Sequence, residues 1–295
     1  MVVKETTGAL YVCATPIGNL EDITLRALKV LGEVQLIAAE DTRRTRKLLT
    51  HYDIHTPLIS YHQHNRLSRI PELVSKLKSG ADIALVSDAG TPGISDPGQE
   101  IIQIAIQEGI SVIPIPGASA VLAGLIIAGY ETDIFTFCGF VPRGRREKRQ
   151  FLEEVSKWSH TVVLYEAPHR LIDTLQVFGV TMPQRPLAIC RELTKVHEEV
   201  VRGLPQELLE HFEAVSPRGE FVLVLSAQRG EQLDTESNRG EPEEMVPIPA
   251  AVLQLMAEGV EKKAAIKQVA RERGVSRRDV YRAVIDIPAQ PCPMK

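Results

Sequence analysis

Residues 83–98, IALVSDAGTPGISDPG, join a short apolar run to a loop that is longer than an ordinary turn into the next helix requires. The loop contains three glycines, two prolines and the carboxylates Asp88 and Asp96. Glycine lets the main chain approach a ligand closely, and Asp88, directly after the run, could accept hydrogen bonds from a ribose hydroxyl or an amino group. Alternatively, the glycines and prolines only shape turns, which is the favoured interpretation for one loop alone. Asp96, just before Pro97, is expected to be the N-cap of the following helix.

Similar apolar runs, rich in Val and Ile, alternate with segments of helical spacing on both sides of this stretch. Runs this apolar are typical of strands that helices cover on both faces, as in a largely parallel α/β sheet. The expected strands of a first unit are LYVCAT from residue 10, LIAAED from 36, PLISYH from 57, IALVSD from 83 and SVIPIP from 111. Those of a second unit are IFTFCGFVP from 134, TVVLYEAP from 161, PLAICRELT from 186 and EFVLVLS from 220.

The organisation along the chain follows from these runs. We expect an N-terminal α/β domain over 1–119, a second α/β domain over 120–228 and an acidic linker over 229–244. Residues 245–295 are expected to form three short helices, with eight Lys or Arg against two acids between 262 and 282. Gly274 suits the turn of a helix-turn-helix-like unit. A basic helical cap that only faces solvent is an equally good interpretation.

Composition narrows the class of protein. The 295 residues are 44% apolar and 24% charged with a net charge of −4, as in a soluble globular protein. The four cysteines are scattered without metal-ligand spacing, and no apolar run is long enough to cross a bilayer. We therefore expect a cytoplasmic protein with no metal and no membrane. Neither GxxxxGK[ST] nor GxGxxG occurs, which disfavours nucleoside triphosphate and ordinary dinucleotide binding.

Charged segments follow several of the expected strands, and ligands of open parallel sheets bind beyond the carboxyl ends of the strands. EDTRRTR from residue 40 brings Glu40 and Asp41 to the start of a helix, with three arginines beside them. A capped helix with a solvated basic face would explain Asp41, but not the arginine cluster. SYHQHN from residue 60 places His62 and His64 on one side of an extended segment, and two histidines without a third ligand favour surface or capping roles over metal binding.

A second basic segment, RGRREKR from residue 143, has five bases and one acid. Such clusters fit phosphate groups through bidentate contacts and charge neutralisation, although a solvated helix start is the usual explanation of one basic run. Arg170, Arg191 and Lys195 are expected at the same side of the sheet. Their presence favours phosphate binding.

Eight of these segments, in this order, resemble the tetrapyrrole (corrin/porphyrin) methylase superfamily, which uses S-adenosylmethionine. They are TPIGNLEDIT, AEDTRRTRKLL, SYHQHN, SDAGTPGISDPG, PGASA, GFVPRGRREK, YEAPHR and CRELTK, and they fall within about residues 8–228. The match is closer to the branch that methylates a ribose 2'-hydroxyl of a cytidine in the decoding centre of 16S ribosomal RNA. The basic C-terminal helices also resemble the helical appendage of many members, less specifically.

The resemblance implies two α/β domains with the cofactor cleft between them, a small C-terminal helical unit and a homodimer. It implies 16S rRNA, within the small ribosomal subunit, as substrate. The implied cofactor contacts are Asp88, Ala89, Gly90, Gly93, Ile94, Ser95, Ser119, Ala120, Tyr165, Ala167 and Gly219. TPIGNL and SDAGTPG stand where the tetrapyrrole branch has a GxGxGD-like first loop and a GDP-containing fourth loop.

The residues at the cleft edge suggest how such an enzyme would work. The sulfonium methyl is already activated, so alignment of the ribose oxygen and exclusion of water are the main requirements. Glu40 or Asp41, with His62 in reserve, would take the hydroxyl proton, and Arg43 would orient the nucleotide. Arg143, Arg145, Arg170 and Lys195 are the expected phosphate contacts. The alternatives are a small-molecule methyltransferase acting on a tetrapyrrole and, less favoured, a non-enzymatic nucleic-acid-binding protein.

Overall fold

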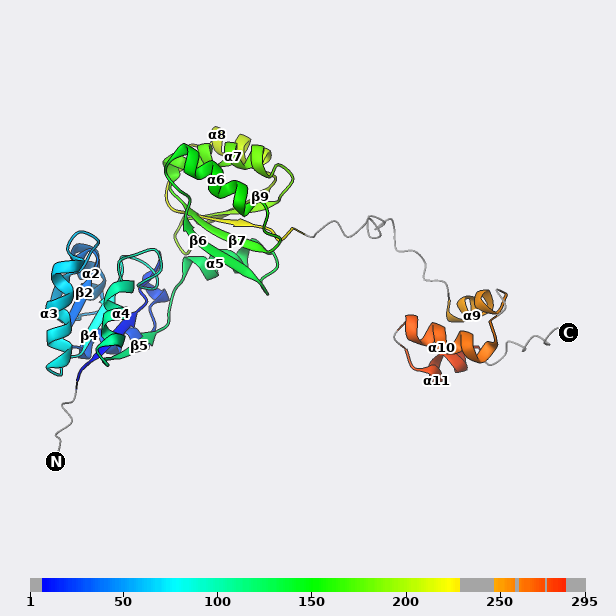
Figure 1. Cartoon of the computed structure of the whole chain (residues 1–295), viewed down its shortest axis with the longest axis horizontal. Helices are drawn as coiled ribbons and strands as arrows, with labels where there is room; N and C mark the ends of the chain where they lie inside the picture. The colour runs from blue at the N-terminus through cyan, green and yellow to red at the C-terminus, as the bar shows by residue number, and fades with distance from the viewer. Residues whose placement is uncertain (1–6, 229–246, 258–259, 274, 285–295) are drawn as a thin grey trace, which may run out of the picture. The chain divides into compact units, whose positions relative to one another are not determined.

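A computed structural model describes residues 7–228, 247–257, 260–273 and 275–284 (Figure 1). The chain divides into two compact units, residues 1–230 and 231–295. The first unit contains two five-stranded sheets, one formed by residues 9–115 and the other by residues 135–225. The expected α/β architecture with two sheets and additional C-terminal helices is therefore confirmed.

The first sheet is entirely parallel, with the strand order β3-β2-β4-β1-β5. Its elements are β1 (Ala9–Cys13), α1 (Leu25–Glu33), β2 (Leu36–Ala39), α2 (Thr42–His51), β3 (Leu58–Ser60), α3 (Arg66–Lys78), β4 (Ile83–Val86), α4 (Gln99–Gln107) and β5 (Ser111–Ile115). A short 3-10 helix, Leu20–Asp22, follows β1. Helices α3 and α4 bury one face of the sheet, while α1 and α2 bury the other, as the apolar strands require.

The helices that follow β1 and β4 leave these neighbouring strands toward opposite faces of the sheet. A crevice opens at the carboxyl ends of strands where the winding direction changes in this way, and this is where open α/β sheets bind ligands. The loop after β4 is the IALVSDAGTPGISDPG stretch. The fold therefore places its glycines and aspartates beside the ends of β1 and β2.

The second sheet has the order β6-β7-β10-β8-β9, and only the β6–β7 pair is parallel. Its elements are α5 (Ala120–Ala128), β6 (Phe135–Phe140), α6 (Arg145–Val155), β7 (Thr161–Glu166), α7 (Leu171–Thr181), β8 (Leu187–Arg191), β9 (Glu199–Gly203), α8 (Pro205–Ala214) and β10 (Phe221–Leu225). Helices α6, α7 and α8 cover one face and α5 covers the other (Figure 1). A 3-10 turn, Pro168–Arg170, precedes α7.

Strand β9 was not expected from the sequence, and the expected largely parallel pairing is wrong for the second sheet. Strand β9 lies at the sheet edge, and none of its residues is fully buried. An edge strand of this kind lacks the continuous apolar run by which the other strands were recognised.

The second unit contains α9 (Ile248–Ala257), α10 (Lys262–Glu272) and α11 (Arg277–Ala283), which confirms the three expected helices. They share a small core that includes Val252, Met256, Val269 and Val280, and the Ser276 side chain caps α11. The predicted acidic linker over 229–244 and the predicted turn at Gly274 lie outside the described residues. Within the described ranges, no helix is both long and apolar enough to cross a membrane.

Candidate functional site

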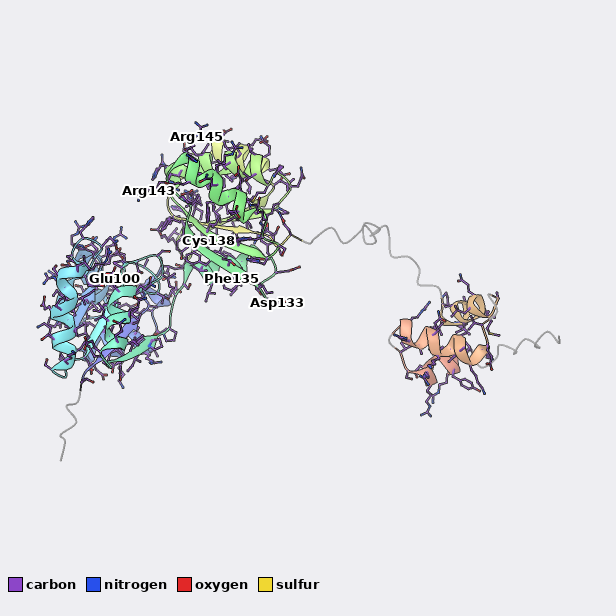
Figure 2. The ribbon with its side chains drawn as sticks, in the orientation of Figure 1. Glu100, Asp133, Phe135, Cys138, Arg143 and Arg145 are labelled. Atoms are coloured by element: carbon purple, nitrogen blue, oxygen red, sulfur yellow. The ribbon has the colours of Figure 1, made fainter. Side chains whose placement is uncertain are left out.

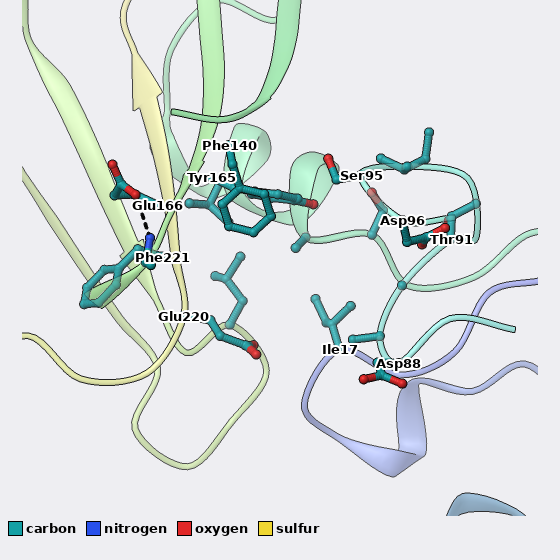
Figure 3. A pocket seen from close by; sticks show the side chains of 18 of the residues that line it. Ile17, Asp88, Thr91, Ser95, Asp96, Phe140, Tyr165, Glu166, Glu220 and Phe221 are labelled. Atoms are coloured by element: carbon teal, nitrogen blue, oxygen red, sulfur yellow. Dashed lines mark hydrogen bonds between the residues drawn. The ribbon is translucent and has the colours of Figure 1, made fainter. Parts of the chain in front are cut away.

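A pocket of about 350 Å³ lies where the carboxyl ends of β1, β2 and β4 face the strand ends on one side of the second sheet (Figure 3). The first sheet contributes residues from the loops after these three strands, and Ser119 and Ala120 come from the start of α5, where the chain passes to the second sheet. The second sheet contributes residues from the ends of β6, β7 and β8 and from the start of β10. This convergence follows from the pairing, since Phe221 at the start of β10 is paired with Glu166 at the end of β7 and with Arg191 at the end of β8.

The loop after β4 is held in an unusual main-chain conformation. Gly90 (φ 81°), Gly93 (φ 87°) and Ser95 (φ 64°) all have positive φ, a region that glycine enters without steric penalty and serine enters rarely. The Asp96 carboxylate accepts hydrogen bonds from the main-chain N–H groups of Gly93 and Gly98. The expected N-cap role of Asp96 is wrong, because α4 begins at Gln99 with Gly98 as its N-cap. Asp96 instead braces the loop and faces the pocket.

The loops after β1 and β4 are joined to each other by the main chain. Thr15 and Gly90 exchange two N–H···O hydrogen bonds of 2.9 and 3.0 Å, and the Thr15 hydroxyl donates to the Ser87 carbonyl over 3.2 Å. This bracing fixes Ile17, which is buried beside Leu193 of the second sheet. The floor of the pocket is therefore formed jointly by residues from both sheets.

Three carboxylates, Glu40, Asp88 and Asp96, line the first-sheet side of the pocket. Burial raises the pKa of Glu40, and the neighbouring Asp88 and Asp96 raise it further, against a hydrogen bond from the Asp88 main chain. Burial also raises the pKa of Asp96. The guanidinium of Arg44 lies 3.4 Å from Asp88. Such a wall favours a cationic ligand, which relieves the crowding of negative charge.

Two aromatic side chains form the opposing wall. The Tyr165 ring lies in edge contact with Phe137 and Phe140, at centroid distances of 4.9 and 5.3 Å, and burial raises the pKa of Tyr165 to about 12. Figure 3 shows the rings of Phe140 and Tyr165 reaching toward the loop that carries Ser95 and Asp96. Aromatic faces attract cations, so this wall fits the same kind of ligand as the carboxylates do.

Gly219 and its neighbours close the pocket on the side of β10. Gly219 has φ 93°, and a Cβ at this position would lie 2.3 Å from Oε1 of Glu192. That oxygen accepts the Glu220 main-chain N–H and the Lys195 ammonium, each over 2.9 Å. Lys195 also pairs with Glu220 over 3.0 Å. Lys195 is thus neutralised by two carboxylates, which argues against its predicted role as a phosphate contact.

Arg170, another predicted phosphate contact, has a structural role inside the second sheet's domain. Its Nε lies 3.2 Å from Oε1 of Glu166, whose side chain is fully buried. Arg170 also donates to the carbonyls of Val141 and Pro142, and the Thr174 hydroxyl donates to Glu166 over 2.5 Å. Because Nη2 is directed at these internal acceptors and the side chain is only 13% exposed, Arg170 does not fit the predicted contact with RNA phosphates.

Arg143 and Arg145 do lie free at the surface, together with Arg146, around the N-terminus of α6 (Figure 2). None of the three has an acidic partner among the described residues. Positive charge is unfavourable near a helix N-terminus, so these arginines do not serve helix stability. Their placement agrees with the predicted phosphate-binding role.

The predicted cofactor contacts gather in one place. Ten of the eleven line the pocket, namely Asp88, Ala89, Gly90, Ile94, Ser95, Ser119, Ala120, Tyr165, Ala167 and Gly219. Gly93 lies in the same loop but outside the lining, where its N–H binds Asp96. The roles of these residues remain predictions.

Of the predicted catalytic residues, only Glu40 lines the pocket. Asp41 is the N-cap of α2, accepting the Arg43 N–H over 2.8 Å, and it pairs with the Arg43 guanidinium over 2.7 Å. Arg43 holds the pKa of Asp41 well below its usual range, which makes Asp41 a poor base. Arg43 is occupied by this pair outside the pocket lining, so neither residue fits its predicted role.

His62 also lies outside the pocket lining. It directly precedes a turn over residues 63–65, so the expected extended segment does not reach His64, and its main-chain N–H donates to Asn65 over 2.8 Å. Its ring lies in edge contact with His64 at 6.0 Å. Among the described residues no group of three or more His, Cys, Asp or Glu could hold a metal ion.

Sequence reasoning missed several lining residues, although most of them lie inside segments that it had singled out. These are Ile17, Arg44, Thr91, Asp96, Phe140, Glu166, Pro168, Leu193 and Val222, while Glu220 and Phe221 line the pocket directly after the predicted Gly219. A signal was available for Arg44, because it follows the strand end by one helical turn, on the same side as Glu40. For the residues of the second sheet, only the register of that sheet decides which side chain faces the pocket, and for Ile17, Thr91 and Asp96 the conformation of the loops after β1 and β4 decides it.

The sequence and the fold have counterparts in known proteins. The family model described as Tetrapyrrole (Corrin/Porphyrin) Methylases matches residues 9–209. A curated relative from Halalkalibacterium halodurans, named Ribosomal RNA small subunit methyltransferase I, is 48% identical over 94% of this chain and 95% of its own length. A relative of the same name from Synechocystis is 46% identical over 96% of this chain and 99% of its own length.

Solved structures show the same fold. Uroporphyrin-III C-methyl transferase from Thermus thermophilus, complexed with S-adenyl homocysteine, is similar with a TM-score of 0.54 and 16% sequence identity. The similarity covers 74% of this chain and 97% of that chain. At this level of identity the similarity concerns the fold alone.

Proposed function

The chain belongs to the tetrapyrrole (corrin/porphyrin) methylase family, and we propose that it transfers the methyl group of S-adenosylmethionine to a cytidine ribose 2'-hydroxyl of 16S ribosomal RNA. One observation carries the substrate class: relatives aligned over nearly their whole length bear the name of a small-subunit ribosomal RNA methyltransferase. The pocket supports the cofactor, because it offers what a cationic methyl donor needs.

The pocket residues fit S-adenosylmethionine by their chemistry. The carboxylates of Glu40, Asp88 and Asp96 face an aromatic wall, and both kinds of group attract a sulfonium or an ammonium. Gly90, with positive φ and no side chain, lets a ligand approach the loop closely, while its own N–H and C=O are bonded to Thr15. When bound there, the cofactor supplies a methyl group that is already activated by its positively charged sulfur.

Glu40 is our candidate for the group that accepts the proton from the ribose hydroxyl. It lines the pocket, its carboxylate is fixed by the Asp88 N–H over 3.2 Å, and burial raises its pKa toward neutrality. A base with a raised pKa accepts a proton more readily than an ordinary carboxylate. The buried side chains of Ile17 and Leu193 at the floor would exclude water from the reacting atoms.

The exposed arginines at the start of α6 are our candidate phosphate contacts. Arg143, Arg145 and Arg146 have no acidic partner in the described part of the chain, and unpaired arginines bind phosphate through bidentate contacts. We further propose that the substrate is presented within the small ribosomal subunit, that the enzyme is a homodimer and that it works in the cytoplasm.

Methyl transfer to isolated subunits tests the proposal. Small subunits from a strain that lacks this protein are incubated with the purified enzyme and S-adenosylmethionine labelled in the methyl group, and the modified nucleotide is mapped. We expect label in one 2'-O-methylcytidine of the 16S rRNA. Absence of label in the 16S rRNA, with label in a tetrapyrrole offered as acceptor in a parallel assay, would overturn the proposal.

A further inference from the structure

A second cavity adjoins the methyl-donor pocket on the side of α2, and a third hollow adjoins that cavity. Arg44 lines both the donor pocket and a second cavity of about 180 Å³, whose wall also includes Thr15, Ser87 and Lys47. Lys47 in turn lines a more open groove along α2. We call this third hollow the α2 groove; its walls are Thr42, Arg43, Arg46, Lys47, Thr50 and His51. The shared residues mean that the donor pocket, the second cavity and the α2 groove follow one another.

The α2 groove is strongly basic. Arg46 and Lys47 are exposed and have no acidic partner among the described residues. Arg43 pairs with Asp41, but its side chain remains 87% exposed. Helix α2 itself, TRRTRKLLTH, contains no acidic residue, so the groove has three cationic side chains, the imidazole of His51 and two threonine hydroxyls.

Helix stability does not explain this composition. Arg43 and Arg44 stand in the first turn of α2, where the helix dipole disfavours positive charge. Surface helices gain a few tenths of a kcal/mol per pair from acids four residues away from bases, roughly 0.2–0.5 kcal/mol, and α2 makes no such pair. Arginine, lysine and threonine side chains are the groups that contact phosphate and sugar oxygens in nucleic-acid complexes.

We propose that the α2 groove binds the sugar-phosphate backbone of the substrate RNA beside the target nucleotide, with Arg46 and Lys47 contacting phosphates. The inference rests on the proposed function, because it assumes that the donor pocket receives a nucleotide of RNA. Arg44 and Lys47 then lie along the path of the strand from the reacting ribose to the groove. Binding on the first sheet would complement the arginines at the start of α6 on the second sheet.

A second copy of the chain is a poorer occupant of the groove. A twofold symmetric contact through this face would bring the same basic side chains of two copies together, and juxtaposed like charges oppose association. A polyanion, in contrast, gains from every unpaired base in the groove, and its binding releases condensed counterions.

The Arg46→Ala/Lys47→Ala double variant tests the inference, with Lys29→Ala as the matched control. Lys29 is also an exposed base of the first sheet's helices, with only a long 4.0 Å contact to Glu33. Binding to small subunits is measured over a series of salt concentrations, alongside S-adenosylmethionine affinity, steady-state methyl transfer and solution mass.

We expect the double variant to bind S-adenosylmethionine as the wild type does and to raise the KM for subunits about tenfold. The slope of log affinity against log salt should become shallower by about 1.4, since a contact to single-stranded nucleic acid contributes roughly 0.7. Lys29→Ala should match the wild type in each measurement.

Three results would overturn parts of this account. If the wild-type enzyme labels no RNA, the proposed function fails and the inference fails with it. If the wild type labels RNA but the double variant keeps its salt slope and KM, the inference alone fails. A changed solution mass with an unchanged slope would instead assign the α2 groove to contacts between copies.

Discussion

Glu40 and Asp88, at the ends of two neighbouring strands, are joined by a hydrogen bond of 3.2 Å from the Asp88 main-chain N–H to the Glu40 carboxylate. The Asp88 carboxylate in turn accepts the Asp41 N–H over 2.9 Å. This exchange fixes both side chains at the rim of the pocket. The two adjacent carboxylates therefore have different roles, since Glu40 faces the pocket while Asp41 caps α2.

Replacement of Glu40 by Gln should lower kcat on saturating subunits by about 100-fold, within the range lost with a general base. The amide oxygen of Gln can still accept the Asp88 N–H, so the strand ends stay joined. Because burial raises the pKa of Glu40, the wild-type kcat should rise as pH passes through that raised pKa, and the variant should lose this rise. Steady-state methyl transfer over a pH series measures both effects.

Asp41→Asn is the control for this substitution, since Asn can still cap α2. We expect nearly wild-type kcat, because the Asp41 carboxylate is held by Arg43 outside the pocket lining. Equal losses in the two variants would show that the effect comes from the shared helix start, and full activity of Glu40→Gln would remove Glu40 as the base.

The first-sheet half of the pocket could be predicted from sequence because its geometry is local to strand ends. Parallel strands place their carboxyl ends at one edge, so a residue immediately after a recognisable apolar run, such as Asp88, must lie at that edge. The role of Asp96 could not be predicted in this way. Its position before Pro97 indicated a helix cap, but the positive φ angles of the loop turn it toward the N–H of Gly93.

The second-sheet half was less predictable, since it depends on contacts between distant segments. Arg143 and Arg170 both stand in basic or polar segments after a strand. Only the structure shows that Arg170 pairs with Glu166 and donates to carbonyls 28 and 29 residues away, while Arg143 has no acidic partner among the described residues. Whether an arginine is paired depends on its neighbours in the folded protein, and the residue pattern along one chain does not show which distant segments become neighbours.

Asp96→Asn should stabilise the fold at neutral pH while weakening cofactor binding. Burial raises the pKa of Asp96, so the folded state binds more protons than the unfolded state above the usual range of a carboxyl. The free energy of unfolding of the wild type therefore falls as pH rises from about 4 through the raised pKa. Asn retains an oxygen for the N–H groups of Gly93 and Gly98 but removes the charge.

Thermal unfolding over this pH range measures the effect. The variant should unfold at a higher temperature than the wild type at about pH 7 and at a similar temperature at about pH 4. Glu33→Gln, at an exposed site, should change neither temperature. An Asp96→Asn variant that is less stable than the wild type at neutral pH would show that its hydrogen bonds outweigh its desolvation.

Gly219→Ala should impair both the fold and the pocket. The new Cβ would lie 2.3 Å from Oε1 of Glu192, an oxygen that already binds Lys195 and the Glu220 N–H. The displaced Glu192 would release both, and the pocket wall beside Glu220 would shift. We expect S-adenosylmethionine affinity, measured by calorimetry, to fall about tenfold or more.

Gly109→Ala is the control that separates the effect of the Cβ clash with Glu192 from the effect of backbone strain at a positive φ. Gly109 also has positive φ, at 70°, but a Cβ there meets nothing within 4 Å. This control should lose about 1–2 kcal/mol of stability, the usual penalty for a left-handed residue with a side chain, and keep its cofactor affinity. Equal cofactor affinities of the two variants would contradict the assignment of Gly219 to the pocket wall.

Arg170→Ala should be strongly destabilising, because it leaves the Glu166 carboxylate buried without its cation. Glu166 is 2% exposed, and loss of one partner from a buried ion pair typically costs about 3–5 kcal/mol. Lys157→Ala, which breaks the exposed pair with Glu154, should cost less than about 1 kcal/mol. Urea unfolding measures both, and adding Glu166→Gln to Arg170→Ala should recover part of the loss by removing the unpaired charge. If Arg170→Ala and Lys157→Ala are equally mild, Arg170 is free to bind RNA after all.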